Sequence, residues 1–229
     1  MGFRASRYRE LIAASWRVLR GSGLRSLLIY FLQWAGFYRC LRVYSHPGFR
    51  ERESARIPIE LGELREDELG DYASLMPDCD LDAIRRRMAQ GDICTTARLP
   101  SGSRELIGFC WTALGRAWVE FVECEIELDD RAAYGYDQFV SSKYRGVAIA
   151  AALESYRDVK LREQGVNLSV YGVWSENTVS VGRIDQRAPA GSESGVLHSY
   201  RLLGWHWNRL ELYPSKYKPL LRLVSNTGR

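Results

Sequence analysis

The stretch YGYDQFVSSKYRGVAIA, residues 134–150, is the part of the chain around which we expect the fold to form. Its first half is rich in aromatic and β-branched residues, which suit a half-buried strand. Its second half contains the small residues Gly146, Ala148 and Ala150, where the backbone can approach a neighbour closely. Apolar residues then recur every three or four positions up to Glu163, which predicts an amphipathic helix. The sequence therefore predicts a strand, a tight turn and a helix.

A strand that enters a helix through a turn of small residues is suited to bind phosphate. The first N–H groups of a helix have no partner within the helix, and they carry the positive end of the helix dipole. An anion held there gains direct hydrogen bonds and a favourable field. Small residues also open helices that simply pack tightly against a sheet, so the turn alone leaves both interpretations open.

The neighbouring segments predict one domain of mixed α and β structure. Between residues 57 and 128 we expect a strand, two helices and an antiparallel meander, whose last strand runs from Trp118 to Leu128. Gly165 is expected to end the main helix, and residues 166–174 alternate as a strand. Because a helix connects this strand to the one before it, the two should be parallel. Parallel strands of this kind leave a crevice at their carboxyl ends, where ligands bind.

At these residues the chain resembles the GNAT superfamily of acyl-CoA-dependent N-acyltransferases. The phosphate loop of that family, Arg/Gln-x-x-Gly-x-Gly/Ala, aligns with Arg145 to Ala150. This chain has Ala148 where the family most often has its first loop glycine. After the second parallel strand, Asn177 and Ser180 match the Asn-x-x-Ser/Ala pair of the family. An Asx turn or a helix N-cap would call for the same residue type as Asn177.

The resemblance implies an α+β fold in which a central mixed, mostly antiparallel sheet is flanked by helices. It also implies acetyl-CoA or another acyl-CoA as cofactor, and direct attack by a primary amine of a small molecule or amino sugar. The residues that it assigns to the cofactor lie at the end of the first parallel strand, in the loop and after the second parallel strand: Phe139, Val140, Arg145, Gly146, Val147, Ala148, Ile149, Ala150, Asn177 and Ser180.

Acyl transfer to an amine also needs a base for the amine and donors for the developing oxyanion. Asp137 lies three residues before Val140, where family members often have an acidic residue. Glu123 and Glu125, expected on the neighbouring strand, are the other candidates for the base. Each of the three carboxylates would equally suit a solvated face of the sheet.

The acid that protonates the leaving thiolate is less well defined by the sequence. In the family this acid is usually a tyrosine, and the corresponding residue is Ile184. Tyr171 and Tyr200 are candidates in its place. A thiolate with a pKa of about 8.5 can also leave without an acid, so the substitution does not remove the expectation of activity.

The overall composition is typical of a folded globular protein, with 229 residues of which 46% are hydrophobic and 26% charged. Five cysteines without a C-x-x-C pair, and the lack of a secretory signal, predict reduced thiols in a cytoplasmic protein. Three dispersed histidines predict that there is no metal site. Near the end of the chain, residues 196–207 and 208–213 predict a closing hairpin.

Charge divides the chain into a basic N-terminal extension, residues 1–56, and the expected acyltransferase domain, residues 57–229. The extension contains eleven arginines and three glutamates, a net charge of +8, so the rest of a chain whose total is +4 carries −4. We place the boundary in the charged segment from Arg50 to Arg56. Since no nucleic-acid-binding motif accompanies the arginines, nucleic acid is not expected as a partner.

Two amphipathic runs in the extension, Arg4 to Arg20 and Leu24 to Tyr38, predict helices. The second has 13 uncharged residues from Ser26 onward, fewer than the ~20 that cross a bilayer. It is expected either to pack on the body of the protein or to lie at a membrane interface, which its basic flanks and aromatic residues suit.

Two other functions follow from these features. One is a non-catalytic module with the GNAT fold, which docks on a membrane or a protein partner through the extension. As a separate expectation, which applies to the enzyme as well, residues 4–44 would make a peripheral contact with the inner face of the membrane. The other is an aminoacyl-tRNA-dependent transferase of related fold.

Overall fold

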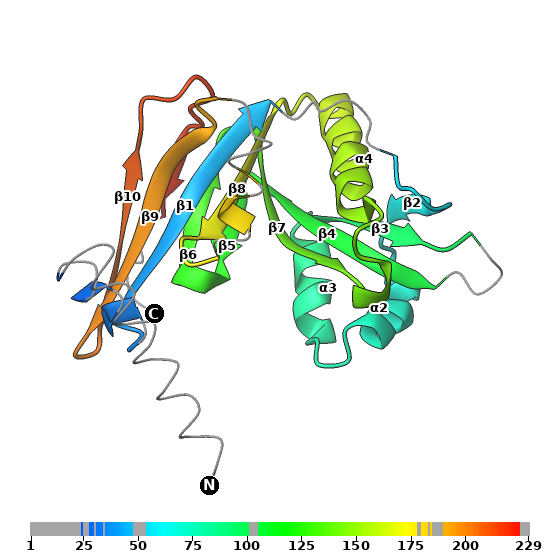
Figure 1. Cartoon of the computed structure of the whole chain (residues 1–229), viewed down its shortest axis with the longest axis horizontal. Helices are drawn as coiled ribbons and strands as arrows, with labels where there is room; N and C mark the ends of the chain where they lie inside the picture. The colour runs from blue at the N-terminus through cyan, green and yellow to red at the C-terminus, as the bar shows by residue number, and fades with distance from the viewer. Residues whose placement is uncertain are drawn as a thin grey trace, which may run out of the picture.

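A computed structural model of the chain describes residues 24, 28–29, 31–33, 35–47, 54–100, 105–177, 180–182, 184 and 190–224. At its centre lies an eight-stranded sheet with the order β10-β9-β1-β8-β7-β4-β3-β2, and a second sheet has the order β11-β6-β5 (Figure 1). Of the paired strands, β7 and β8 run parallel and the other pairs are antiparallel. The predicted α+β fold with a mixed, mostly antiparallel sheet is therefore confirmed.

The first strands and helices, in chain order, are β1 (Tyr38–Pro47), β2 (Glu60–Glu63), η1 (Glu66–Glu68), α2 (Leu69–Leu75), α3 (Leu81–Ala89), β3 (Ile93–Arg98), β4 (Leu106–Leu114) and β5 (Arg116–Val119). They are followed by η2 (Glu120–Val122), β6 (Cys124–Leu128), β7 (Ala132–Val140), η3 (Ser142–Tyr144), α4 (Ile149–Glu163), β8 (Leu168–Trp174), β9 (Glu193–Leu202), β10 (Trp205–Leu212) and β11 (Leu221–Leu223). The predicted helix up to Glu163 and the predicted parallel strand after it are both present.

Helices cover both faces of the part of the sheet that contains β4 and β7 (Figure 1). On one face α4 packs through Ile149 and Leu153, which are almost fully buried. On the other face α2 and α3 contribute Tyr72 and Ile84 to a cluster around Trp111. Burying one such large apolar side chain contributes about 1.5–3 kcal/mol, so these contacts hold α4 firmly beside β7.

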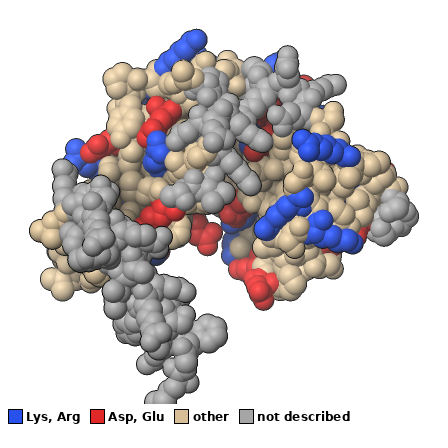
Figure 2. All heavy atoms as spheres, viewed as in Figure 1, with Lys and Arg blue, Asp and Glu red and all other residues tan. Residues whose placement is uncertain are grey.

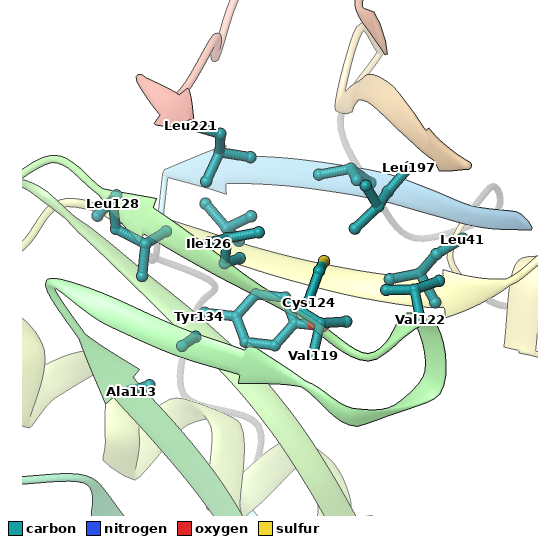
Figure 3. Close-up of a cluster of buried hydrophobic side chains, with 14 residues drawn as sticks. Leu41, Ala113, Val119, Val122, Cys124, Ile126, Leu128, Tyr134, Leu197 and Leu221 are labelled. Carbon is teal, nitrogen blue, oxygen red and sulfur yellow. The ribbon is translucent and has the colours of Figure 1, made fainter. Parts of the chain in front are cut away.

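The small sheet of β5, β6 and β11 packs over the other part of the large sheet. Figure 3 shows Val122, Ile126 and Leu221 from this region facing Leu41 and Leu197 of the large sheet. These residues belong to the largest apolar cluster among the described residues. The cluster joins the small sheet to β1 and β9.

The small sheet corrects the prediction of one long strand from Trp118 to Leu128. The chain instead forms β5, one turn of 3-10 helix and β6, and β5 and β6 pair with each other. The reversal takes place at Glu123, which has the left-handed φ of +50°. Alternation along the sequence did not reveal this turn, because Glu123 is neither glycine nor asparagine, the usual residues at such a φ.

Strand β1 corrects the predicted boundary between extension and body. It pairs with β8 on one side, where Val43 lies opposite Gly172, and with β9 on the other, where Leu41 lies opposite Leu197. Residues 38–47 therefore belong to the sheet of the body, although they fall within the predicted extension 1–56. The first predicted helix, Arg4 to Arg20, lies outside the described residues.

The second predicted helix is described in part. Residues 24, 28–29 and 31–33 are helical, and the chain then turns at residues 35–37 into β1. Within the described ranges, no helix combines the length and the apolar character that a membrane span requires.

Candidate active site

The parallel strands β7 and β8 separate at their carboxyl ends. They pair from Ala132 opposite Leu168 to Gly135 opposite Tyr171, and no further. The cause lies on the other side of β7, where Trp111 is opposite Tyr136 and Phe109 opposite Phe139. One extra residue of β7 is thus accommodated in a β-bulge, and a bulge bends the strand that carries it. The bend leaves an opening between the ends of β7 and β8.

Asp137 lies in this bulge with a left-handed φ of +44°. Its carboxylate accepts a hydrogen bond of 2.7 Å from Nη1 of Arg87 on α3. Arg87 also lies over the rings of Trp111 and Tyr136, and its Nη2 is 3.9 Å from a carboxylate oxygen of Glu120. Arg87 therefore connects α3 to β7 and to the turn between β5 and β6.

The loop before α4 leaves the N-terminus of that helix open. Gly146 and Ala148 both have left-handed φ angles, +85° and +63°, and Ala148 is the N-cap residue without contributing a side-chain cap. The N–H groups of Ile149, Ala150 and Ala151 donate no hydrogen bond to any other described residue. Since α4 has 15 residues, these free donors coincide with the positive end of a full helix dipole.

A groove of about 940 Å³ runs along this loop and the end of β7. Nine of the ten residues that the sequence assigned to the cofactor line it: Phe139, Val140, Arg145, Gly146, Ala148, Ile149, Ala150, Asn177 and Ser180. Val147 is not among the lining residues, and its carbonyl accepts a hydrogen bond from the backbone N–H of Arg56. Arg56 itself lines the groove, as Arg145 does, so two arginines contribute to its lining.

Asn177 begins a helical turn at the edge of this groove. Its Oδ1 accepts a hydrogen bond of 3.1 Å from the backbone N–H of Ser180, and its carbonyl accepts one from Val181. The N-cap role that the sequence left open is therefore present. The side-chain amide nitrogen has no hydrogen-bond partner among the described residues, so it can still donate to a ligand in the groove.

A second cavity of about 470 Å³ lies between the separated strands. Asp137 and Gln138 of β7, Glu154 and Arg157 of α4 and Tyr171 of β8 are among its lining residues. Nε2 of Gln138 donates a hydrogen bond of 3.1 Å to Glu154. Glu154 forms no ion pair with a lysine or arginine in the described part of the chain. It is thus a carboxylate at the crevice without a direct ion pair, although it interacts electrostatically with the guanidinium of Arg157.

A buried ion pair forms the wall of the second cavity. Nη2 of Arg157 donates to Asp158 at 2.8 Å, and the hydroxyl of Ser169 on β8 also donates to Asp158. Arg157 passes over Gly135, where a Cβ atom would lie 2.8 Å from its Nη1. Burial raises the pKa of the nearby Cys110 thiol, so this cysteine stays protonated and is not a nucleophile.

The other predicted carboxylates lie away from both cavities. Glu123 forms ion pairs with Arg39 and Arg201, and the hydrogen bond from Arg201 holds the pKa of its carboxyl below the ordinary value. Glu125 lies in the small sheet opposite Trp118. The turn at Glu123 separates the two residues from β7, so the structure does not bring them to the crevice.

Of the two tyrosines considered for the acid, Tyr171 lines the second cavity, as does Ile184 at the position where the family usually has its acid. Tyr200 instead stacks on Trp207 in β10 with a centroid distance of 5.2 Å. Glu154 and Gln138 were not predicted. In the sequence, Glu154 lies on the polar side of the predicted helix and Gln138 lies near the end of the predicted strand. A solvated surface would equally explain a polar residue at either position.

Charged side chains of both signs surround a hollow on one face of the molecule. Figure 2 shows this hollow in the middle of the lower edge, between the parts of the molecule that carry the small sheet and α3 in Figure 1. Among the described residues, no group of three or more His, Cys, Asp or Glu side chains is arranged to hold a metal ion.

No protein-family model matches the chain, and no curated protein matches its sequence. Solved structures with a similar fold include an aminoglycoside 6'-N-acetyltransferase from Acinetobacter baumannii, with 17% identity and a TM-score of 0.46 over 59% of this chain and 93% of that one. A ribosomal-protein-alanine N-acetyltransferase from Brucella melitensis biovar Abortus has 18% identity and a TM-score of 0.44 over 58% and 93%. A GNAT-family acetyltransferase from Staphylococcus aureus has 13% identity and a TM-score of 0.43 over 57% and 82%. The case for a function rests on the site itself.

Proposed function

We propose that the protein is an acyl-CoA-dependent N-acyltransferase, which moves an acetyl or other acyl group to a primary amine of a small molecule or amino sugar. The observation that carries the proposal is the opening between the parallel strands β7 and β8, directly beside the uncapped N-terminus of α4. A thioester reaching through such an opening has its phosphates at the helix and its carbonyl between the strands.

The groove supplies what a pyrophosphate and a pantetheine arm require. Free N–H groups at the start of α4 would bind the pyrophosphate, with the guanidinium groups of Arg56 and Arg145 as counter-charges. Beyond Gly135 the edge of β7 is released from β8, so its backbone can pair with the pantetheine amides and donate to the oxyanion. The amide nitrogen of Asn177 would hold the arm from the opposite side.

The carboxylates around the crevice suit a cationic acceptor. The amine must lose a proton before its nitrogen attacks the thioester carbonyl, after which the C–S bond breaks and the CoA thiolate leaves. We assign proton removal to Glu154, because it forms no direct ion pair in the described part of the chain, whereas Asp137 is held by Arg87. Asp137 would then contribute negative charge on the side from which the ammonium group enters. Tyr171 is the candidate that protonates the thiolate.

Calorimetry with acetyl-CoA tests the cofactor site. Gly146→Glu places a carboxylate in the groove at a position with a left-handed φ, and we expect it to abolish binding. Gly115→Glu is the matched control, because Gly115 also has a left-handed φ, of +70°, and has open space around it away from the groove. Lack of binding by the wild type, or equal binding by both variants, would refute the assignment.

Turnover of the acetyl-CoA thioester over a panel of amines and amino sugars then tests the reaction. A wild-type protein that binds acetyl-CoA and leaves the thioester intact with every amine would contradict the acyl-transfer activity. The cofactor site would survive that result.

A further inference from the structure

Large apolar side chains are exposed at one end of the eight-stranded sheet, where β9 turns into β10. Leu203 is 90% exposed and Trp205 77%, and Leu202, Trp207 and Phe37 are also exposed. We call these five residues the hairpin tip. They are contiguous, because Leu202 lies opposite Trp205 in the hairpin and the N–H of Arg201 donates to the carbonyl of Phe37.

The turn within the hairpin tip is not the one that folding alone would favour. Leu203 and Gly204 have left-handed φ angles of +49° and +84°, as in the two-residue turns for which Asn-Gly is preferred. Leucine is disfavoured at such a φ, and here its side chain also gains almost no burial. Leu203 thus has both an unfavourable φ and an exposed apolar side chain, and neither stabilises the folded state. Such a residue points to a role in binding rather than in folding.

The partly described helix before β1 adds a second apolar surface. Leu24, Leu28 and Leu32 are spaced by four residues, so they follow one side of the helix, and all three are exposed. The N–H of Phe37 donates to the carbonyl of Leu32, which brings the end of this helix next to the hairpin tip. Since these leucines do not pack on the body, the structure favours the interfacial alternative for this helix over burial.

Charge distinguishes among the surfaces that could cover these side chains. The first 56 residues carry a net charge of +8, and arginines 4, 7, 9, 17, 20 and 25 precede or flank the apolar stripe. A second copy of the chain would bring the same positive charge to this end. A bilayer with anionic lipids instead offers opposite charge together with an apolar interior, and tryptophan is enriched at its interface.

We propose that the hairpin tip and the leucine stripe form a docking surface for a membrane that contains anionic lipids. Leu203 and Trp205 insert between the lipid headgroups, and the net positive charge of residues 1–56 favours anionic over neutral lipids. Docking through this surface also sets the orientation of the protein on the membrane. Because the N–H of Ser175 donates to Cys40 next to the start of β1, the carboxyl end of β8 lies at the same end of the sheet as the hairpin tip.

Sedimentation of the full-length protein with vesicles tests the proposal. We expect retention by vesicles of phosphatidylcholine with phosphatidylglycerol, and much less by phosphatidylcholine alone or at high salt. Leu203→Asn with Trp205→Thr should lower the partition coefficient by about tenfold or more, because each large apolar side chain taken from water contributes about tenfold. Asparagine suits the left-handed φ and threonine suits a strand, so this variant should fold.

Leu220→Ser is the matched control, since Leu220 is exposed but lies before β11 at the opposite end of the sheet. It should sediment like the wild type. The proposal is overturned if the wild type is not retained by anionic vesicles, or if the hairpin-tip variant is retained as well as the control. It is also overturned if the wild type forms a dimer without vesicles and the hairpin-tip variant does not, because the surface would then bind a second copy. Quenching of tryptophan fluorescence by brominated lipid, reduced in Trp205→Phe, gives an independent readout of insertion.

Discussion

The backbone of Ala148 is strained in the folded protein, because a residue with a Cβ atom disfavours a left-handed φ. Ala148 has a φ of +63°, where an L-residue other than glycine loses about 1 kcal/mol. We expect Ala148→Gly to raise the free energy of unfolding by about 1 kcal/mol. Ala150→Gly is the control, because Ala150 lies in the first turn of α4, where glycine should lower stability by about 0.5–1 kcal/mol. Urea unfolding that gives both variants the same sign would contradict this account.

Glu154 is the carboxylate on which the proposed proton transfer depends. We expect Glu154→Gln to lower kcat/KM for the amine about 100-fold or more, with the affinity for acetyl-CoA unchanged. Asp137→Asn is the comparison, because asparagine tolerates the left-handed φ of this bulge. Steady-state kinetics should give it the smaller loss. A larger loss for Asp137→Asn than for Glu154→Gln would reverse the two roles.

The contact of α4 with β8 depends on the buried pair of Arg157 and Asp158, which Ser169 joins. Removing one partner leaves an uncompensated buried charge, so Asp158→Asn should lower the free energy of unfolding by about 3–5 kcal/mol. Arg157→Met combined with Asp158→Asn should recover most of this loss, since both charges of the buried pair are then removed. A double-mutant cycle measures the coupling. Additive losses would show that the two side chains act independently.

A histidine of β9 contacts β1, and the folded state disfavours its protonation. His198 Nδ1 is 2.6 Å from the Tyr38 hydroxyl, and burial lowers the pKa of His198 from 6.5, although Glu211 opposes this shift. Because the folded state disfavours the protonated ring, the contribution of His198 to the free energy of unfolding is fully present above pH 6.5. This contribution is lost as the pH falls from 6.5 through the lowered folded-state pKa.

The wild type should therefore lose more stability between pH 7 and pH 5 than His198→Gln does. Urea unfolding at several pH values measures the free energy of unfolding of both proteins. The contributions of the other two histidines cancel in the difference, because both proteins contain them. Equal pH dependence of the two proteins would mean that His198 has the same pKa folded and unfolded.

For the molecule as a whole, the sequence was sufficient where a pattern is local. The strand, loop and helix of residues 134–163 have a clear periodicity, and they form as that periodicity predicts. Nine of the ten assigned cofactor residues come together, because they lie in two short segments joined by α4 and β8.

The errors arose where distant segments meet. The place of β1 between β8 and β9 depends on pairing with residues far along the chain, which no local pattern encodes. Glu123 adopts a left-handed turn that its residue type does not predict, and this moved two candidate carboxylates away from the crevice. Glu154 lies at the crevice only because the bulge at Asp137 opens β7 from β8.

The central position of β1 also affects how the chain folds as it is made. Tyr38 and Arg42 leave the ribosome first, but their partners His198 and Glu193 follow 160 and 151 residues later. At about 5–20 residues per second, this strand waits about 10–30 s for its neighbours. During that time a mostly apolar strand is available to bind other nascent chains. We expect folding in the cell to depend on a chaperone that holds the N-terminal segment until β9 has been synthesised.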